Sequence, residues 1–438
     1  MKPLRIRIGL IAGLSIVLDC AVMAADKPAG ASEFFFKDGD RIVMMGDSIT
    51  EQHMYSTYVE LWTLTRFPAW NLTFRNVGIG GDGAPGGNSR FKRDVLCHNP
   101  TAMTVDFGMN DATGDFNRFL TGLQGIADQA RSNHVRLALL TPQPVEKSED
   151  GPAPEGSATK LEKFSAGAKA IAASNNVGFV DQFHPYLQVL DKARAADPKN
   201  RIMGGDPVHP GPPGQALMAA EILKGLKFPS RVSAAEIDAA KLAVVKVQQC
   251  QITGLAAGTK GAIQFKRLDA ALTYFPDRAE SILKWTPLLE ELNDYRLKVT
   301  GLKPGQYEVR LGGAKVAEYS AAALAEGVNL ASAALKAGPV AAQIKEIVSA
   351  VNAKNGYFHD RIFRGVLLAG ISIPDFVENR KDMVDQIESQ RGLAFTKRMA
   401  EMPRYEEAIR KSLVIQPHAV ELVPVAAAAE SRSGSNRD

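Results

Sequence analysis

Two segments that lie far apart in the chain carry the residue types of a serine nucleophile and its base. Ser48 lies in the string MGDSIT, and His209 lies in GDPVHPG, three residues after Asp206. A serine hydroxyl is a weak nucleophile at neutral pH and needs an adjacent base to accept its proton. His209 alone reads as a loop histidine before Pro210, but with Asp206 nearby it is a candidate base whose tautomer a carboxylate would hold. These residue types predict acyl transfer at a serine. Activity should fall in acid, because a protonated imidazole, whose reference pKa is about 6.5, accepts no proton.

A glycine-rich string, RNVGIGGDGAPGG, allows two interpretations. Gly78, Gly80 and Gly83 have the G-x-G-x-x-G spacing of a dinucleotide-binding turn, and Asp106 follows at a distance typical of a ribose-binding acid. In that motif the last glycine leads directly into a helix. Here APGGNS follows, and its proline and glycines predict that no helix begins before about Asn88. The string therefore favours a loop that binds a smaller anion.

Short apolar runs alternate with longer helical stretches between residue 40 and about residue 228. The candidate strands are 41–46, 72–77, 102–107, 136–141 and 177–181. The clearest helical patterns, with apolar residues at a period of 3.6, cover 115–133 and 157–174. This alternation predicts βαβ units and a parallel sheet with helices on both faces. Functional groups of such sheets collect at the carboxyl ends of the strands.

Four strings follow these predicted strands in a fixed order: MGDSIT, NVGIGGDG, FGMND and GDPVHPGPPGQ. Together they resemble the SGNH (GDSL-type) hydrolase family over about residues 38–228. The resemblance implies an α/β fold, a three-layer flavodoxin-like sandwich with a five-stranded, mostly parallel sheet. It also implies three donors to an oxyanion, which are the N–H of Ser48, the N–H of Gly81 and the side-chain amide of Asn110. Asp111, the next residue, is interpreted as structural.

Composition excludes several other classes of protein. The 438 residues are 45% apolar and 23% charged, with a net charge of +4, and the basic residues are scattered rather than clustered as in a nucleic-acid binder. The sequence has neither a G-x-S-x-G elbow nor an H-E-x-x-H metal motif, and we expect no metal or organic cofactor. Four histidines are interpreted as surface or packing residues: His53, His98, His134 and His184.

The N-terminus has a basic start, a short apolar run and small residues before a possible cleavage site, which predicts a signal peptide over residues 1–25. An uncleaved anchor is the alternative. Cleavage would give a secreted or periplasmic protein with no membrane span. It would leave Cys97 and Cys250, which could pair or stay as separate thiols.

The chain is long enough for more than one domain. We assign residues 33–230 to the hydrolase domain, 231–425 to an α+β module of unknown role, and 426–438 to a disordered tail. Within the module, strands with glycine turns precede helical segments at 340–353, 376–390 and 396–412. Tyr357, Phe358 and His359 could line a binding face, although a packed core explains them more simply.

The sequence therefore predicts a secreted serine esterase with an acyl-enzyme intermediate. By family analogy its substrate would be a small-molecule or polysaccharide ester, foremost an acetylated carbohydrate, with lipid or short acyl esters as alternatives. A non-catalytic carbohydrate-binding or scaffold protein on the same fold is the competing hypothesis. The oligomeric state is not predicted.

Overall fold

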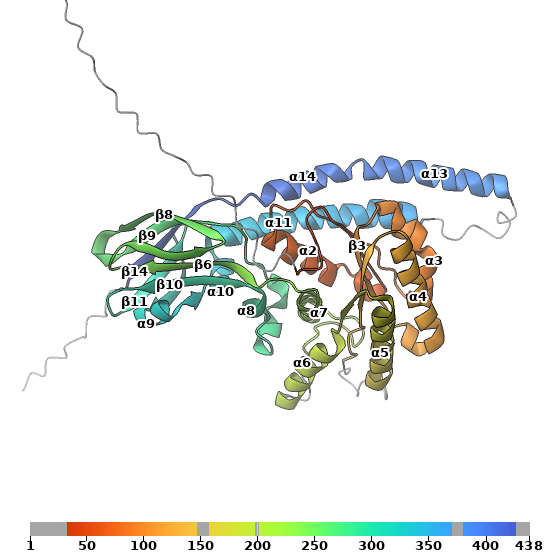
Figure 1. Ribbon diagram of the computed structural model, residues 1–438, viewed down its shortest axis with the longest axis horizontal. Coiled ribbons are helices and arrows are strands. Elements are labelled where there is room, and N and C mark those ends of the chain that lie inside the picture. The colour runs from red at the N-terminus through yellow and green to blue at the C-terminus, as the bar shows by residue number, and fades with distance from the viewer. Residues whose placement is uncertain (1–32, 147–156, 198, 200, 370–379, 426–438) are drawn as a thin grey trace, which may run out of the picture.

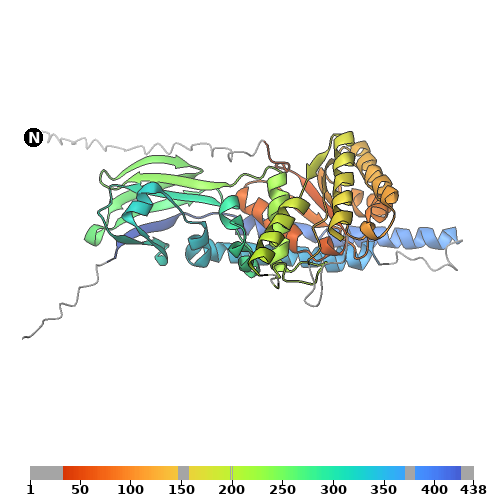
Figure 2. The same cartoon turned by 90° about the horizontal axis from the view of Figure 1, so that it is seen from below.

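The computed structural model describes residues 33–146, 157–197, 199, 201–369 and 380–425. The predicted signal peptide and the predicted tail at 426–438 lie outside these residues. An α/β part and a β-rich part lie at opposite ends of the molecule in both views, and long helices run along them (Figures 1 and 2).

The α/β part is built on a five-stranded sheet in the order β2-β1-β3-β4-β5. Its strands are β1 (Arg41–Gly46), β2 (Thr73–Asn76), β3 (Ala102–Asp106), β4 (Arg136–Leu140) and β5 (Gly178–Val180). All four strand pairs are parallel. The strand order is the flavodoxin-like one, so the predicted fold class is confirmed.

Helices cover both faces of this sheet. They are α1 (Ser48–Glu51), α2 (Met54–Arg66), α3 (Ala84–Asp94), α4 (Phe116–Ser132), α5 (Ser157–Asn175), α6 (Phe183–Ala196) and α7 (Pro212–Gly225). Side chains of β1 alternate between two cores, as the period of a strand requires. Ile42 and Met44 join the core under α2, α6 and α7, whereas Val43 and Met45 join the core under α3 and α4.

Helix α3 begins earlier than the sequence predicted. It starts at Ala84, directly after the last glycine of the G-x-G-x-x-G string, and not at about Asn88. Pro85 lies in the first turn, where the fixed φ of proline suits a helix and its missing N–H has no intrahelical partner to lose. Gly87 lets the helix pack closely, because a Cβ there would lie 2.4 Å from the ring of Phe107.

The β-rich part contains two further sheets, ordered β13-β10-β6-β7 and β12-β11-β14-β9-β8. Their strands are β6 (Arg231–Asp238), β7 (Ala243–Gln248), β8 (Cys250–Ala257), β9 (Ile263–Asp269), β10 (Asp294–Thr300), β11 (Gln306–Leu311), β12 (Ala314–Ser320), β13 (Val328–Asn329) and β14 (His418–Pro424). A buried network joins the two sheets. Asp269 accepts hydrogen bonds from Ser233, Arg267 and Tyr295 at 2.6–2.9 Å.

Helices from the C-terminal half return to the α/β part. They include α11 (Gly338–Tyr357), the π-helix η5 (Phe358–Leu367), α13 (Lys381–Met399) and α14 (Met402–Ser412). Helix α11 packs against α2 and α14 (Figure 1). Lys354 on α11 bonds Glu60 on α2 at 2.6 Å, and both side chains are buried. The helical segment predicted at 376–390 begins with residues 376–379, which lie outside the described residues.

Cys97 and Cys250 are free thiols and do not pair with each other. None of the helices in the described ranges combines the length and the apolar character that crossing a membrane would require.

Candidate active site

Ser48 is the first residue of α1, immediately after β1. Gly46 ends the strand at a point with no room for a side chain, because a Cβ there would lie 2.0 Å from Oγ1 of Thr50. Asp47 caps the helix, and its carboxylate accepts a hydrogen bond from the N–H of Ile49 at 2.9 Å. Burial raises the pKa of the Asp47 carboxyl to about 7. This sharp strand-to-helix turn sets the Ser48 hydroxyl at the carboxyl edge of the sheet.

The structure brings the three predicted residues into one chain of hydrogen bonds. Oγ of Ser48 lies 2.9 Å from Nε2 of His209, and Nδ1 of His209 lies 2.9 Å from Oδ2 of Asp206. The other oxygen of Asp206 accepts from the N–H groups of Val208 and His209. Partial burial would raise the pKa of the Asp206 carboxyl, but these hydrogen bonds stabilise the carboxylate and bring its pKa below the usual value. Asp206 is therefore an anion at neutral pH.

The loop that carries His209 is held by two side chains that were not predicted from the sequence. Nε2 of Gln143 donates to the carbonyl of Val208 at 3.0 Å. The buried carboxylate of Glu146 accepts from the N–H of Ile202 at 2.8 Å and from that of Met203 at 3.3 Å. Both side chains follow β4 and contact a segment some 60 positions away in the chain, so no local pattern reveals them.

The loop with Gly81 lies beside Ser48. Gly81 has a φ of +75°, which favours glycine, and a Cβ built on Gly80 would lie 4.0 Å from the Cβ of Ser48. The N–H of Gly80 donates to Oε2 of Glu51 at 2.7 Å. Within the described residues, the N–H groups of Ser48 and Gly81 have no protein acceptor. They are thus available to an incoming oxyanion.

Asn110 lies at the same loop, after β3. Its Nδ2 donates to the carbonyl of Asp82 at 2.8 Å, which leaves the second hydrogen of the amide for another acceptor. The three predicted oxyanion donors therefore belong to segments in mutual contact.

Asp111 occupies the N-terminus of α3, where a dinucleotide would place its phosphates. Its Oδ1 accepts from the N–H of Ala84 at 3.0 Å, and a Cβ on Gly83 would lie 2.6 Å from that oxygen. Asp106, the apparent ribose-binding acid, is buried and accepts from Gln182 at 3.0 Å. The glycine string therefore forms a loop whose helix is capped by a protein carboxylate.

Arg90 on α3 connects the segments around the site. It donates to the carboxylate of Asp82 at 2.7 Å, to the carbonyl of Val77 at 2.7 Å and to that of Gly46 at 3.3 Å. It also pairs with the buried Asp94 at 3.3 Å. One buried guanidinium thus joins the ends of β1 and β2 to the Gly81 loop.

Residues of η5 reach the site from the C-terminal half. Arg364 donates to Oε1 of Glu51 through Nε at 3.0 Å, and the other oxygen of Glu51 holds the N–H of Gly80. Nδ1 of His359 lies 2.8 Å from Nε2 of His53. His53 is therefore a packing residue, as predicted, and its partner lies more than 300 positions away.

Two histidines, the buried His98 and the half-buried His53, make the contact between η5 and the α/β part sensitive to acid. Burial lowers the pKa of His53 and of His98 to about 3. His98 packs against Phe358 and Phe395, and neither of its ring nitrogens has a hydrogen-bond partner among the described residues. Protonation of either ring therefore favours the unfolded or detached state.

We predict that the free energy of unfolding falls as the pH drops from about 6.5 toward 3, since the unfolded state then binds protons that the folded state does not. At pH 5 each of the two histidines should cost about 2 kcal/mol relative to pH 7. Urea unfolding of the chain and of His98→Leu, at pH 7 and pH 5, measures this. In His98→Leu, the loss of unfolding free energy between pH 7 and pH 5 that the two histidines cause should be about half as large. An unaltered pH dependence in this variant would show that His98 does not cause the loss.

No group of three or more His, Cys, Asp or Glu side chains in the described ranges is arranged to hold a metal ion.

The chain was compared with protein families, with solved structures and with curated proteins. The model of the GDSL-like Lipase/Acylhydrolase family matches residues 44–217. A solved structure of a gut microbial diltiazem-metabolizing enzyme is 26% identical with a TM-score of 0.75, covering 89% of this chain and 98% of its own. An acetylxylan esterase from Geobacillus stearothermophilus is 21% identical with a TM-score of 0.39, covering 44% of this chain and 96% of its own. No curated protein matches the chain.

Proposed function

We propose, from the match of residues 44–217 to the model of the GDSL-like Lipase/Acylhydrolase family, that the protein is a serine esterase in which Ser48 is the nucleophile. The observation that carries the proposal is the hydrogen-bonded series from Ser48 through His209 to Asp206. A hydroxyl 2.9 Å from an imidazole, which in turn contacts a carboxylate, has the geometry that activates a serine.

The reaction follows from these contacts. Oγ of Ser48 attacks the ester carbonyl carbon while Nε2 of His209 takes its proton, and Asp206 stabilises the imidazolium. The carbonyl oxygen becomes an anion and accepts hydrogen bonds from the N–H groups of Ser48 and Gly81 and from the amide of Asn110. Collapse of the tetrahedral intermediate expels the alcohol, which takes the proton from His209. Water then repeats the sequence on the acyl-enzyme and releases the carboxylic acid.

We propose an acetylated carbohydrate as the first substrate class, in a secreted or periplasmic setting. The exposed side chain of Asp206 and the exposed Gly81 loop support a site open enough for a large alcohol group. The signal-peptide pattern at the N-terminus supports secretion. A bulky drug ester is the alternative, because the relative that matches nearly the whole chain is a diltiazem-metabolizing enzyme.

The test combines covalent labelling with product release. A fluorophosphonate probe should label the protein stoichiometrically, and peptide mapping should place the adduct on Ser48. The protein should hydrolyse p-nitrophenyl acetate and release acetate from a panel of acetylated polysaccharides, with diltiazem as a comparison. Labelling or hydrolysis that persists in Ser48→Ala would remove Ser48 from the mechanism. Absence of both in the unaltered protein would favour the binding or scaffold role.

The contact between Arg364 and Glu51 gives a prediction about the Gly81 loop. Arg364→Ala should lower kcat by about three- to tenfold with little change in KM, because a displaced oxyanion donor acts mainly in the transition state. Glu51→Gln keeps an acceptor for Gly80 but loses the charge that Arg364 contacts, so it should have a similar effect. Steady-state kinetics of both single variants and of the double variant measure the coupling. Fully additive effects would show that Arg364 does not act through Glu51.

A further inference from the structure

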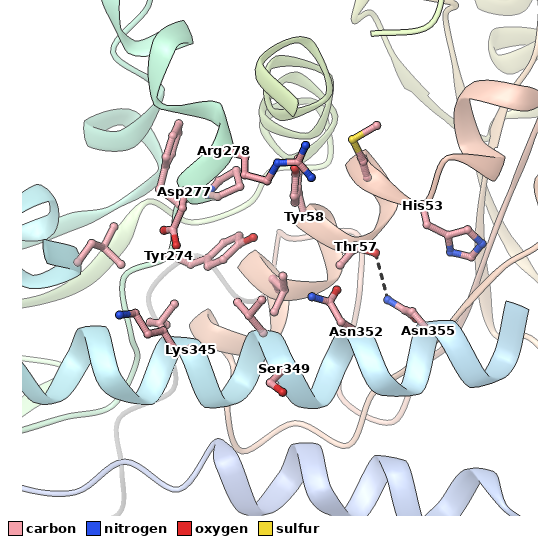
Figure 3. Close-up of a pocket in the computed structure, with 18 of the residues that line it drawn as sticks. His53, Thr57, Tyr58, Tyr274, Asp277, Arg278, Lys345, Ser349, Asn352 and Asn355 are labelled. Atoms are coloured by element: carbon pink, nitrogen blue, oxygen red, sulfur yellow. Dashed lines mark hydrogen bonds between the residues drawn. The ribbon is translucent and has the colours of Figure 1, made fainter. Parts of the chain in front are cut away.

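A cavity of about 640 Å³ lies between α2, α11 and residues 274–278, where the α/β and β-rich parts meet (Figure 3). Its volume falls in the range of sites for small organic ligands, roughly 300–1,000 Å³. Ser48, Asp206 and His209 are not among its lining residues. The cavity is therefore a separate feature, which the esterase proposal does not use.

The deep wall of the cavity is apolar. Leu61 from α2, Phe275, and Ile344 and Val348 from α11 line it. These side chains are buried or half-buried. A flat or branched hydrocarbon group that packs against them would displace water from apolar surface, which favours binding.

The phenol groups of Tyr58 and Tyr274 add hydrogen-bond donors. Neither hydroxyl has a protein acceptor among the described residues, and burial raises the pKa of both phenols, so both carry their proton at neutral pH. Because phenols that lack protein acceptors can donate to a bound molecule, the cavity offers a ligand two such groups.

The mouth of the cavity carries more positive than negative charge. Arg278 and Lys345 both line it, and neither forms an ion pair with another described residue. Asp277 is the single carboxylate in the lining, and it forms no ion pair with either cation. His53 and His359, at one end, are neutral because burial lowers the pKa of each.

We propose that this cavity binds a small amphiphilic carboxylate, an aromatic or branched hydrocarbon body with one anionic group. The body would pack against Ile344 and Val348, and the carboxylate would accept hydrogen bonds from the guanidinium of Arg278, while Lys345 adds positive charge at the other side of the mouth. Figure 3 shows the Arg278 side chain extending toward Tyr58, whereas the Lys345 side chain leaves α11 on the other side of the Tyr274 ring and points away from Arg278. A cation beside an apolar wall suits this ligand better than a neutral sugar, which has no anionic group to bond Arg278 and little apolar surface to cover the wall.

The cavity is close to the catalytic segments but is chemically independent of them. Gln52 lines it, and the N–H of Gln52 donates to the carbonyl of Ser48 at 3.0 Å. Its side chain accepts from Gln215 at 2.6 Å, and Gln215 also donates to the carbonyl of Pro210. Because Ser48 Oγ takes no part in binding, the site can be tested in the full chain carrying Ser48→Ala, whether or not the esterase proposal holds.

The experiment titrates Ser48→Ala protein with 2-naphthoate and with its neutral counterpart 2-naphthamide, by calorimetry. We expect 2-naphthoate to bind with a Kd of about 0.1 mM or tighter and the amide at least tenfold more weakly, since charge-assisted hydrogen bonds to the carboxylate are lost. Arg278→Gln, at an exposed position, should weaken naphthoate binding by about tenfold. Lys345→Gln, also at an exposed position, should weaken it less, because its ammonium acts only through its charge. Lys169→Gln, an exposed lysine of α5, is the matched control and should have no effect.

Val348→Phe fills the cavity and should weaken binding of both ligands, with folding checked by circular dichroism. Three results would overturn the proposal: no binding of 2-naphthoate, equal affinity for the amide, or unchanged affinity in Arg278→Gln and Lys345→Gln. Tighter binding of a xylo-oligosaccharide than of 2-naphthoate would also overturn it, and would assign the cavity to a neutral sugar.

Discussion

Ser48→Ala and His209→Ala are each expected to lower kcat for p-nitrophenyl acetate hydrolysis by about 10⁴- to 10⁶-fold, and the double variant should be no slower than either single one. The two residues act as a unit, since the hydroxyl that lies 2.9 Å from Nε2 of His209 is a poor nucleophile without that base. Removing either partner ends the same step. What is left should come from the oxyanion donors of the Gly81 loop and from binding.

The control for this prediction is His184→Ala. His184 also contacts an aspartate three residues away, Asp181, through Nδ1 at 2.7 Å, and it is exposed on α6. It thus has the same local His–Asp pair as the proposed base, but its other described contact is Glu162 and not a serine, so its loss should leave kcat unchanged. Rates that fall additively in the double variant would mean that Ser48 and His209 contribute to separate steps.

Arg90→Leu is expected to lower the free energy of unfolding by about 3 kcal/mol, because it leaves the half-buried carboxylate of Asp82 without its counter-charge and removes one of the two arginine partners of the buried Asp94, the other being Arg93. It should also reduce kcat by about 100-fold in the molecules that stay folded. Arg90 bonds the carboxylate of Asp82, whose own carbonyl accepts from Asn110, so loss of the guanidinium loosens the oxyanion donors.

Lys92→Leu is the matched control for Arg90→Leu, because Lys92 is an exposed cation on the same helix. Chemical denaturation and steady-state kinetics, at a temperature where both variants are folded, separate the two effects. Arg90→Lys should recover part of the stability but little of the turnover, since an ammonium group cannot reproduce the several directed bonds of a guanidinium. If Arg90→Leu kept the turnover of the unaltered protein, Arg90 would have only a structural role.

Residues whose function depends on local sequence were predictable. Ser48, Gly81 and Asn110 each follow a strand, so the ends of the predicted strands were enough to select them as candidates. Asp206 and His209 share one turn, and their short spacing identified them as a pair. The start of α3 was not predicted, because the glycines and proline that disfavour a helix in isolation are tolerated where Gly87 packs on Phe107. Tertiary contact outweighed local propensity there.

The supporting residues had no sequence signal. Arg90, Glu146 and Arg364 are ordinary charged residues in helical or loop contexts, and each acts through partners that only the fold brings near. Arg364 contacts Glu51 across 313 positions, a pairing that no spacing rule suggests. A single sequence therefore gives the reacting groups, whereas the groups that orient them depend on the completed packing.

The ion pair of Lys354 and Glu60 has a practical consequence for anyone who wants a smaller catalyst. The pair joins α2, which follows the nucleophile, to a helix encoded more than a hundred codons after the last strand of the parallel sheet. A truncated gene that stops near codon 230 would leave Glu60 without Lys354, on an apolar surface that α11 covers in the full chain. Such an enzyme would need Glu60 and its apolar neighbours redesigned together, or the missing helix supplied as a separate polypeptide.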